Sequence, residues 1–132
     1  MPRTIEFEDR ELVVRFTGLV HYATLTEELR IPYTAIRSVS TEAFVPPRGT
    51  IRWFGTDVPF THIREGRFSH GGEWYFLSYE DAHRAITLYL DDFSHGDAKE
   101  PLRVVVLGTP DPAGLRDAID KNRARPAASP SR

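Results

Sequence analysis

The sequence predicts a mainly β domain that is closed by one C-terminal α-helix. Short runs in which apolar and polar residues alternate recur along the chain as far as residue 107, and this period of two is typical of half-buried strands. Turn-forming residues separate the runs at close spacing. A single helical pattern follows over residues 111–122. Many short antiparallel runs favour a sandwich or a partly open barrel, and the apolar stripe of the helix suits a plug for the open mouth.

The first strands are predicted over residues 4–7 and 11–16, with a turn at Asp9 and Arg10. In the second run, alternate positions share one apolar face, which comprises Leu12, Val14 and Phe16. A short helix is predicted over residues 17–25. Strands at 29–33 and 36–44 come next, and the second ends at the turn residues Pro46-Pro47-Arg48-Gly49.

The middle of the chain contains the clearest hairpin signal. Gly71 and Gly72 supply the positive φ angles of a two-residue turn, between strands at 66–70 and 73–79. A shorter strand is predicted at 50–54. The last strand pair is predicted at 84–90 and 102–107, joined by the polar loop 91–100.

The C-terminal helix has well-marked ends. Asp111 suits the N-cap position, because its carboxylate can accept from unpaired N–H groups of the first turn. Pro112 suits the first helical position, where no N–H is needed. Leu115, Ala118 and Ile119 follow at the spacing of a buried stripe.

Length and composition indicate one globular domain over residues 1–122, followed by a disordered basic tail at 123–132 that lacks an apolar anchor. A chain of 132 residues buries roughly two-thirds of its unfolded surface. The formal net charge of −2 predicts no strong attraction to nucleic acid. The chain has no cysteine, no signal-peptide pattern and no transmembrane segment. We therefore expect a cytoplasmic protein.

The residues with chemical potential do not form a catalytic or metal-binding pattern. The five histidines are scattered, without the close spacing of metal ligands, so we expect neither a metal nor any other cofactor. Ser69 and His70 are adjacent in a strand, so their side chains point to opposite faces. Ser94 and His95 lie in a loop. No nucleophile elbow or phosphate-binding loop is present, and we predict that the protein is not an enzyme.

Several short motifs, in this order, resemble the bacterial pleckstrin-homology-like (PH-like) family. The pattern Ile-Pro-Tyr-x-x-Ile-x-x-Val begins at Ile31, Gly55-Thr56-Asp57-Val58-Pro59 follows, and Gly66-Arg67-Phe68 precedes an aromatic strand. Val105-Val106-Leu107-Gly108 and Asp111-Pro112-x-x-Leu115 end the series. The resemblance covers residues 5–122. It implies a barrel or sandwich of two orthogonal antiparallel sheets closed at one corner by the helix, in a family whose members are mostly of unknown function.

Charge and aromatic residues give the candidate binding residues. Residues 29–72 carry six arginines against three acids, whereas residues 73–120 carry ten acids against four bases. Arginines in a cluster can hold phosphate or carboxylate groups, or can pair with acids on neighbouring strands. In the strand 73–79, both faces are apolar, which suggests an additional apolar contact such as self-association. The candidate residues are Arg48, Arg52, Trp53, Arg64, Arg67, Trp74 and Tyr75.

The sequence therefore predicts a non-catalytic binding or scaffolding module. Its partner would be a protein or a second copy, engaged through a strand edge or through the two-sided aromatic strand. Two alternatives remain open. One is binding of an anionic lipid or phosphate ligand through the central arginines, and the other is a small enzyme with a pocket in a curved sheet.

Overall fold

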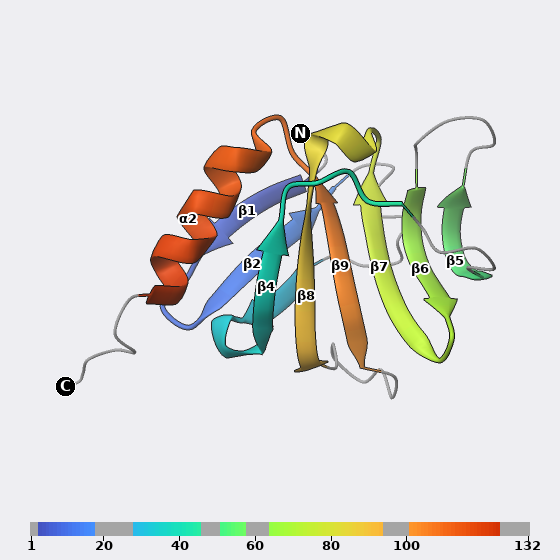
Figure 1. Cartoon of the computed structure of the whole chain (residues 1–132), viewed down its shortest axis with the longest axis horizontal. Coiled ribbons are helices and arrows are strands. Elements are labelled where there is room, and N and C mark those ends of the chain that lie inside the picture. The colour runs from blue at the N-terminus through green and yellow to red at the C-terminus, as the bar shows by residue number, and fades with distance from the viewer. Residues whose placement is uncertain (1–2, 18–27, 46–50, 58–63, 94–100, 125–132) are drawn as a thin grey trace.

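The fold consists of two β-sheets and one C-terminal helix (Figure 1). The computed structural model describes residues 3–17, 28–45, 51–57, 64–93 and 101–124, and for 51–57, 64–65 and 92–93 it describes the backbone only. The two sheets share no strand, so the described part of the chain is a sandwich-like arrangement rather than a closed barrel. The prediction of a mainly β fold with one C-terminal helix is confirmed.

The smaller sheet is an antiparallel meander of three strands, β1 (Arg3–Phe7), β2 (Glu11–Phe16) and β3 (Glu28–Pro32). Its register places Ile5, Val14 and Leu29 in one row across the sheet. Because side chains alternate along a strand, every second row faces the same side, so this row and the row of Phe7, Leu12 and Ile31 share the apolar inner face. The chain then passes through the short 3-10 helix η1 (Tyr33–Ala35) into the larger sheet.

The larger sheet has six strands in the order β4-β8-β9-β7-β6-β5. Their bounds are β4 (Ile36–Ser40), β5 (Ile51–Asp57), β6 (Arg64–His70), β7 (Glu73–Tyr79), β8 (Ala85–Phe93) and β9 (Leu102–Gly108). A short 3-10 helix, η2 (Ala82–Arg84), connects β7 to β8. The predicted Gly-Gly hairpin is confirmed, since Gly71 and Gly72 have φ angles of 58° and 83° between β6 and β7.

The central pair of this sheet differs from the expectation of purely antiparallel sheets. Strand β9 pairs antiparallel with β8 on one side and parallel with β7 on the other. The reason is topological: β8 is placed one strand away from β7, and β9 fills the gap between them. A strand buried on both faces is a near-continuous apolar run, and Val104, Val105, Val106 and Leu107 are all buried.

The helix α2 (Pro112–Ala124) begins as predicted, with Asp111 as its cap. The Oδ1 atom of Asp111 accepts a hydrogen bond from the Gly114 N–H at 3.1 Å, and Ile119 is fully buried. The helix continues past the predicted domain end at residue 122. Arg123 donates to the carbonyl oxygens of Ile36 at 3.0 Å and Arg37 at 3.3 Å, which ties the end of α2 to β4 and corrects its assignment to a tail.

The main core lies between the two sheets and α2. It combines side chains from the inner faces of β2 and β3 with those of β7, β8 and β9, as well as Ile119 of the helix. A second cluster covers the opposite face of the larger sheet and includes Phe68, Leu77 and Val106. The larger sheet is therefore buried on both faces around β7 and β9.

Three other expectations had different outcomes. The strand predicted over 36–44 ends at Ser40, and residues 41–45 have no regular secondary structure. The predicted helix at 17–25 lies outside the described residues, apart from Thr17. The predicted tail lies outside them from residue 125 onward.

Candidate functional site: a groove beside the edge strand β1

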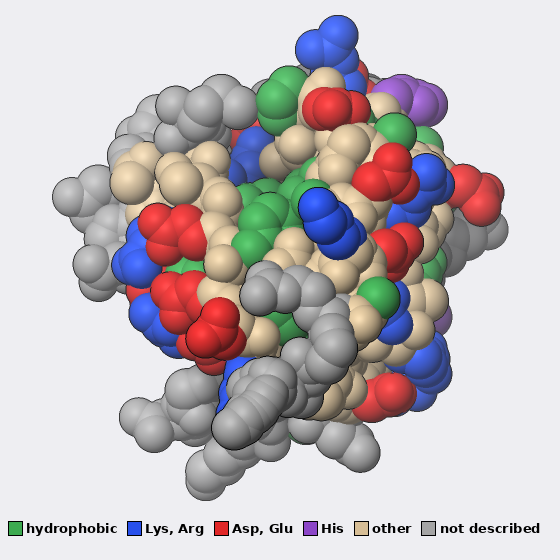
Figure 2. All heavy atoms as spheres, turned by 90° about the vertical axis from the view of Figure 1, so that its left-hand side faces the viewer, with side chains coloured by type: hydrophobic (Ala, Val, Ile, Leu, Met, Phe, Trp, Pro, Cys, Tyr) green, Lys and Arg blue, Asp and Glu red, His purple; other side chains and the backbone are tan. Residues whose placement is uncertain are grey.

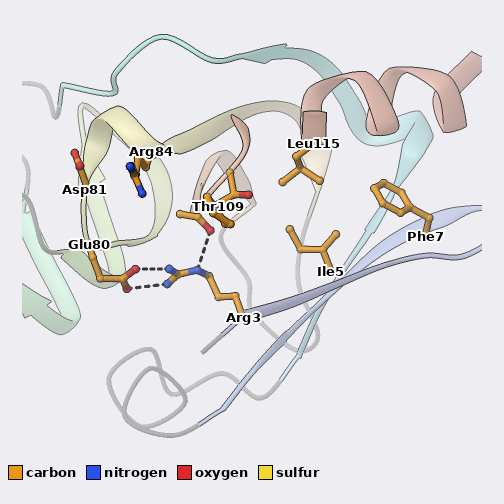
Figure 3. A pocket seen from close by; sticks show the side chains of 10 residues that line it. Arg3, Ile5, Phe7, Glu80, Asp81, Arg84, Thr109 and Leu115 are labelled. Carbon is orange, nitrogen blue, oxygen red and sulfur yellow. Dashed lines mark hydrogen bonds and ion pairs between the residues drawn. The ribbon is translucent and has the colours of Figure 1, made fainter. Parts of the chain in front are cut away.

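A shallow groove of about 440 Å³ opens where three parts of the fold meet (Figure 3). One wall is β1, the second is the corner between β7 and β8, and the third is the link from β9 into α2. The residues that line it include Ile5, Phe7, Arg84, Thr109, Pro110 and Leu115. Residues more than 100 positions apart in the chain therefore form one surface.

Arg3 lines the groove and is bonded to several groups of the larger sheet and its β7–β8 corner (Figure 3). Its Nε donates to the Gly108 carbonyl at 3.1 Å, and its Nη1 donates to Ser78 Oγ and to Glu80 Oε2, both at 3.0 Å. Its Nη2 donates to the other Glu80 carboxylate oxygen, which makes the ion pair bidentate. The Arg3 side chain is only 7% exposed. This guanidinium links β1 to the larger sheet.

Gly108 allows this close approach. A Cβ at position 108 would lie 2.7 Å from Arg3 Nη2 and 3.2 Å from the Tyr79 Cα. Only a residue without a side chain fits here without displacing Arg3 or the backbone.

Arg84 lines the groove at the corner between β7 and β8 (Figure 3). Its backbone is held on both sides, because its N–H donates to the Asp81 carbonyl and its own carbonyl accepts from Thr109 N–H, both at 2.9 Å. Its side chain is exposed and makes no hydrogen bond or ion pair with any described residue. The neighbouring Asp81 carboxylate accepts from His83 N–H at 2.9 Å. Among the described residues that line the groove, Arg84 is therefore the one cation without an ion pair.

The remaining wall is apolar. Ile5 and Leu115 pack against the main core and point toward each other across the groove (Figure 3). Phe7 is 37% exposed, and within the described ranges Val45 is the only other large hydrophobic residue that is exposed. Figure 2 shows hydrophobic side chains at the centre of the α2 side of the molecule, with acidic and basic side chains around them.

The edge of β1 adjoins this wall. In the smaller sheet, β1 pairs with β2 alone, so its other edge makes no sheet hydrogen bonds with the described chain. An unpaired edge presents a row of N–H and C=O groups that can bind another extended chain. The groove thus combines main-chain donors and acceptors, an apolar wall and a cation.

Of the seven sequence-predicted site residues, the structure describes the side chains of Arg67, Trp74 and Tyr75, and it places Trp74 and Tyr75 on opposite faces of the larger sheet. Trp74 is half-buried against the main core, whereas Tyr75 is buried in the second cluster on the opposite face. The ring centroid of Tyr75 lies 6.0 Å from that of Phe44. Burial, with further contributions from Glu73 and Tyr89, raises the pKa of Tyr75 above its ordinary value. Both aromatic side chains therefore pack inside this single chain.

Of the four arginines in the prediction, the structure describes the side chain of one, Arg67. Arg67 is half-buried on β6. Arg48 lies outside the described residues, and so do the side chains of Arg52, Trp53 and Arg64, although the last three are on β5 and β6. Binding of an anionic lipid or phosphate through these arginines stays a prediction, as does the absence of catalysis.

The groove residues Arg3, Phe7 and Arg84 were missed from the sequence. Arg3 meets Glu80 and Gly108 only because β1 folds back onto the larger sheet, and no local pattern marks contacts of 77 and 105 positions' separation. Phe7 carried a weak signal, since it is an aromatic residue directly before the acidic turn at Glu8 and Asp9.

Searches for other sites and for relatives gave no further assignment. Among the described residues, no three histidine, aspartate or glutamate side chains gather as a metal site would require. In the same part of the chain, no helix is both long enough and apolar enough to cross a bilayer. Comparison with protein-family models, with curated proteins and with solved structures finds no match to this chain.

Proposed function

We propose that this chain is a non-catalytic protein-binding module that takes up an extended segment of its partner along the free edge of β1. The observation that carries the proposal is the apolar groove directly beside this unpaired strand edge. In binding of this kind, main-chain hydrogen bonds supply affinity and pockets for alternate side chains supply specificity.

The dimensions of the groove suit one or two side chains of such a segment. Its volume of about 440 Å³ lies within the roughly 300–1,000 Å³ that is usual for small-ligand sites. The five residues of β1 give an edge of about 17 Å at roughly 3.3 Å per residue. A partner segment of similar length would place alternate side chains over Ile5 and Phe7.

The two-sidedness of β7 no longer calls for a partner. Tyr75 and Leu77 are buried on the second face by this chain itself. The strand edges are therefore more accessible to a partner than the faces around β7, and β1 is the edge strand that contributes side chains to the groove.

Membership of the bacterial PH-like family, with orthogonal sheets, is part of this proposal. Its support is the sequence of short motifs, together with two sheets and one C-terminal helix. The parallel pairing of β7 with β9 departs from the antiparallel sheets that the resemblance implies. We also propose a cytoplasmic location, which rests on the composition of the chain.

The test is selection from a displayed library of random peptides, followed by binding measurements with purified variants. We expect enriched peptides whose binding is lost in Phe7→Asp, because this change puts a charge into the apolar wall. Val45→Asp is the matched control, since Val45 is also an exposed apolar residue but does not line the groove. Binding that is unaffected by Phe7→Asp, or the absence of any enriched peptide, would overturn the proposal.

Sedimentation equilibrium measures the oligomeric state of the same proteins, and so tests whether the partner is a second copy of this chain. If the segment bound at β1 comes from this chain, the wild-type protein forms dimers and Phe7→Asp is monomeric. A dimer that persists in Phe7→Asp would show that copies associate elsewhere, which contradicts self-binding through the groove.

A further inference from the structure

We infer that the groove selects partner segments by an acidic side chain, which pairs with Arg84 while an apolar side chain of the same segment lies against Ile5 and Phe7. This inference rests on the proposed function and names the chemistry of the segment. It follows from the charged residues described around the groove: the Arg3 and Glu80 side chains pair with each other, whereas the Arg84 guanidinium forms no ion pair or hydrogen bond with any of them.

The guanidinium groups of Arg3 and Arg84 differ in how many of their N–H donors are already hydrogen-bonded. The Arg3 guanidinium donates to Gly108, Ser78 and both carboxylate oxygens of Glu80, and it is almost fully buried. Arg84 makes no side-chain hydrogen bond or ion pair within the described ranges, and its side chain is exposed. An incoming carboxylate therefore has one available partner, which is Arg84.

The acidic groups of the rim are also engaged. Glu80 is held by the bidentate pair with Arg3, and the Asp81 carboxylate accepts from His83 N–H. Neither forms an ion pair with Arg84. The charges of these four lining residues sum to zero, but the guanidinium donors of Arg84 are not used by either carboxylate and can bind a negative group on the ligand.

The backbone of Arg84 is held in place by hydrogen bonds on both sides of its Cα atom. Both its N–H and its C=O are hydrogen-bonded, to Asp81 and Thr109, so that binding orders only the side chain. A guanidinium binds a carboxylate through two parallel N–H donors. Because the Arg84 side chain is exposed, such a pair adds specificity and a modest free energy of binding.

The test compares library selections on four proteins: wild type, Arg84→Gln, Arg84→Glu and the control Arg116→Gln. Arg116 is a half-buried arginine on α2 that lies outside the groove, and among the described residues it pairs only with its neighbour Asp117, at 3.4 Å. We expect wild type and Arg116→Gln to enrich peptides with Asp or Glu at a fixed spacing from an apolar residue. Arg84→Gln should lose this preference, and Arg84→Glu should replace it with Lys or Arg.

Affinity measurements then give the size of the effect. One enriched peptide and its counterpart with the acid replaced by the amide are titrated by fluorescence anisotropy. Wild type should bind the acidic form roughly 2- to 5-fold more tightly, as expected for an ion pair with an exposed side chain, whereas Arg84→Gln should not distinguish the two.

The outcomes separate this inference from the proposed function. Peptides that are lost in Phe7→Asp but show no acidic preference would overturn the role of Arg84 and leave the groove as the binding site. An acidic preference that survives in Arg84→Glu would have the same meaning. If no peptide depends on Phe7, the proposed function and this inference both fail.

Discussion

The two sheets of this protein differ in the polarity and burial of their faces. The smaller sheet has an apolar inner face and a charged outer face, where Arg15 and Arg30 pair with four glutamates, Glu6, Glu8, Glu11 and Glu28. The larger sheet is apolar on both faces around β7 and β9, and both are buried. In such a molecule the strand edges, not the sheet faces, are what remains open to a partner.

The outer face of the smaller sheet shows how a charged layer is held together. Hydrogen bonds to Glu28 and Glu11 raise the pKa of the Arg30 guanidinium, which remains charged under all ordinary conditions. Val13 is fully buried in the row between Glu6 and Arg30. Ion pairs of this exposed kind contribute little to stability, so the sheet depends on its inner face.

The largest expected effects come from truncating core residues on the two faces of β7. Phe76 lies in the main core, 5.4 Å from the ring of Phe16, and Leu77 lies in the second cluster; both are fully buried. Phe76→Ala should lower the free energy of unfolding by about 3–5 kcal/mol and Leu77→Ala by about 2–5 kcal/mol, through lost burial and cavity formation. Urea denaturation followed by circular dichroism measures both.

Comparable losses on the two faces would support a sheet buried on both sides. A loss below about 1 kcal/mol for Leu77→Ala, close to the value for a surface residue, would mean that the second face is not packed in solution. An additional apolar contact at this face of β7, such as self-association, would then again be needed to cover it.

The next effect concerns the junction between the two sheets at Arg3 and Gly108. Gly108→Ala places a Cβ against Arg3 and the Tyr79 backbone, and should destabilise the protein by about 1–3 kcal/mol, as overpacking does. Arg3→Ala removes the partner of Glu80 and Ser78, and should cost about 1–3 kcal/mol. Both free energies are measured by urea denaturation.

The double variant distinguishes the cause. Because the closest atom to the new Cβ belongs to Arg3, the cost of Gly108→Ala should fall when Arg3 is already alanine. Strict additivity would contradict this, and would assign the strain to the Tyr79 backbone alone.

The contrast between local and distant contacts also explains what could be predicted from the sequence. The Gly71-Gly72 turn and the Asp111-Pro112 cap depend on neighbouring residues, and both were predicted correctly. The insertion of β9 between β8 and β7 is a choice of strand order, and neither turn residues nor alternation encode it. The groove depends on that order, since β9 carries Gly108 to Arg3.

A smaller effect is expected at the helix that closes the sandwich. Asp111→Ala removes the acceptor for the Gly114 N–H and should lower the free energy of unfolding by about 0.5–2 kcal/mol. Asp117→Ala is the control, because Asp117 is an exposed acid within the same helix and, in the described part of the chain, pairs with Arg116 alone. Equal urea midpoints for the two variants would show that the cap does not stabilise the fold.

The smallest effect comes from the titration of Tyr75, which tests whether water reaches the second cluster on the larger sheet. Burial raises the pKa of this phenol above its ordinary value of 10.0, so the folded state favours the neutral form. The stabilising contribution of this group is complete below the unfolded-state pKa and is lost as the pH rises through the folded-state pKa. Between pH 9 and 11, on the order of the titration range, the urea midpoint of wild type should therefore fall more steeply than that of Tyr75→Phe. Because the two proteins differ only at position 75, the difference between the two curves reports on Tyr75. Parallel curves would mean that water reaches the phenol, and that the two faces of the larger sheet differ more than their burial indicates.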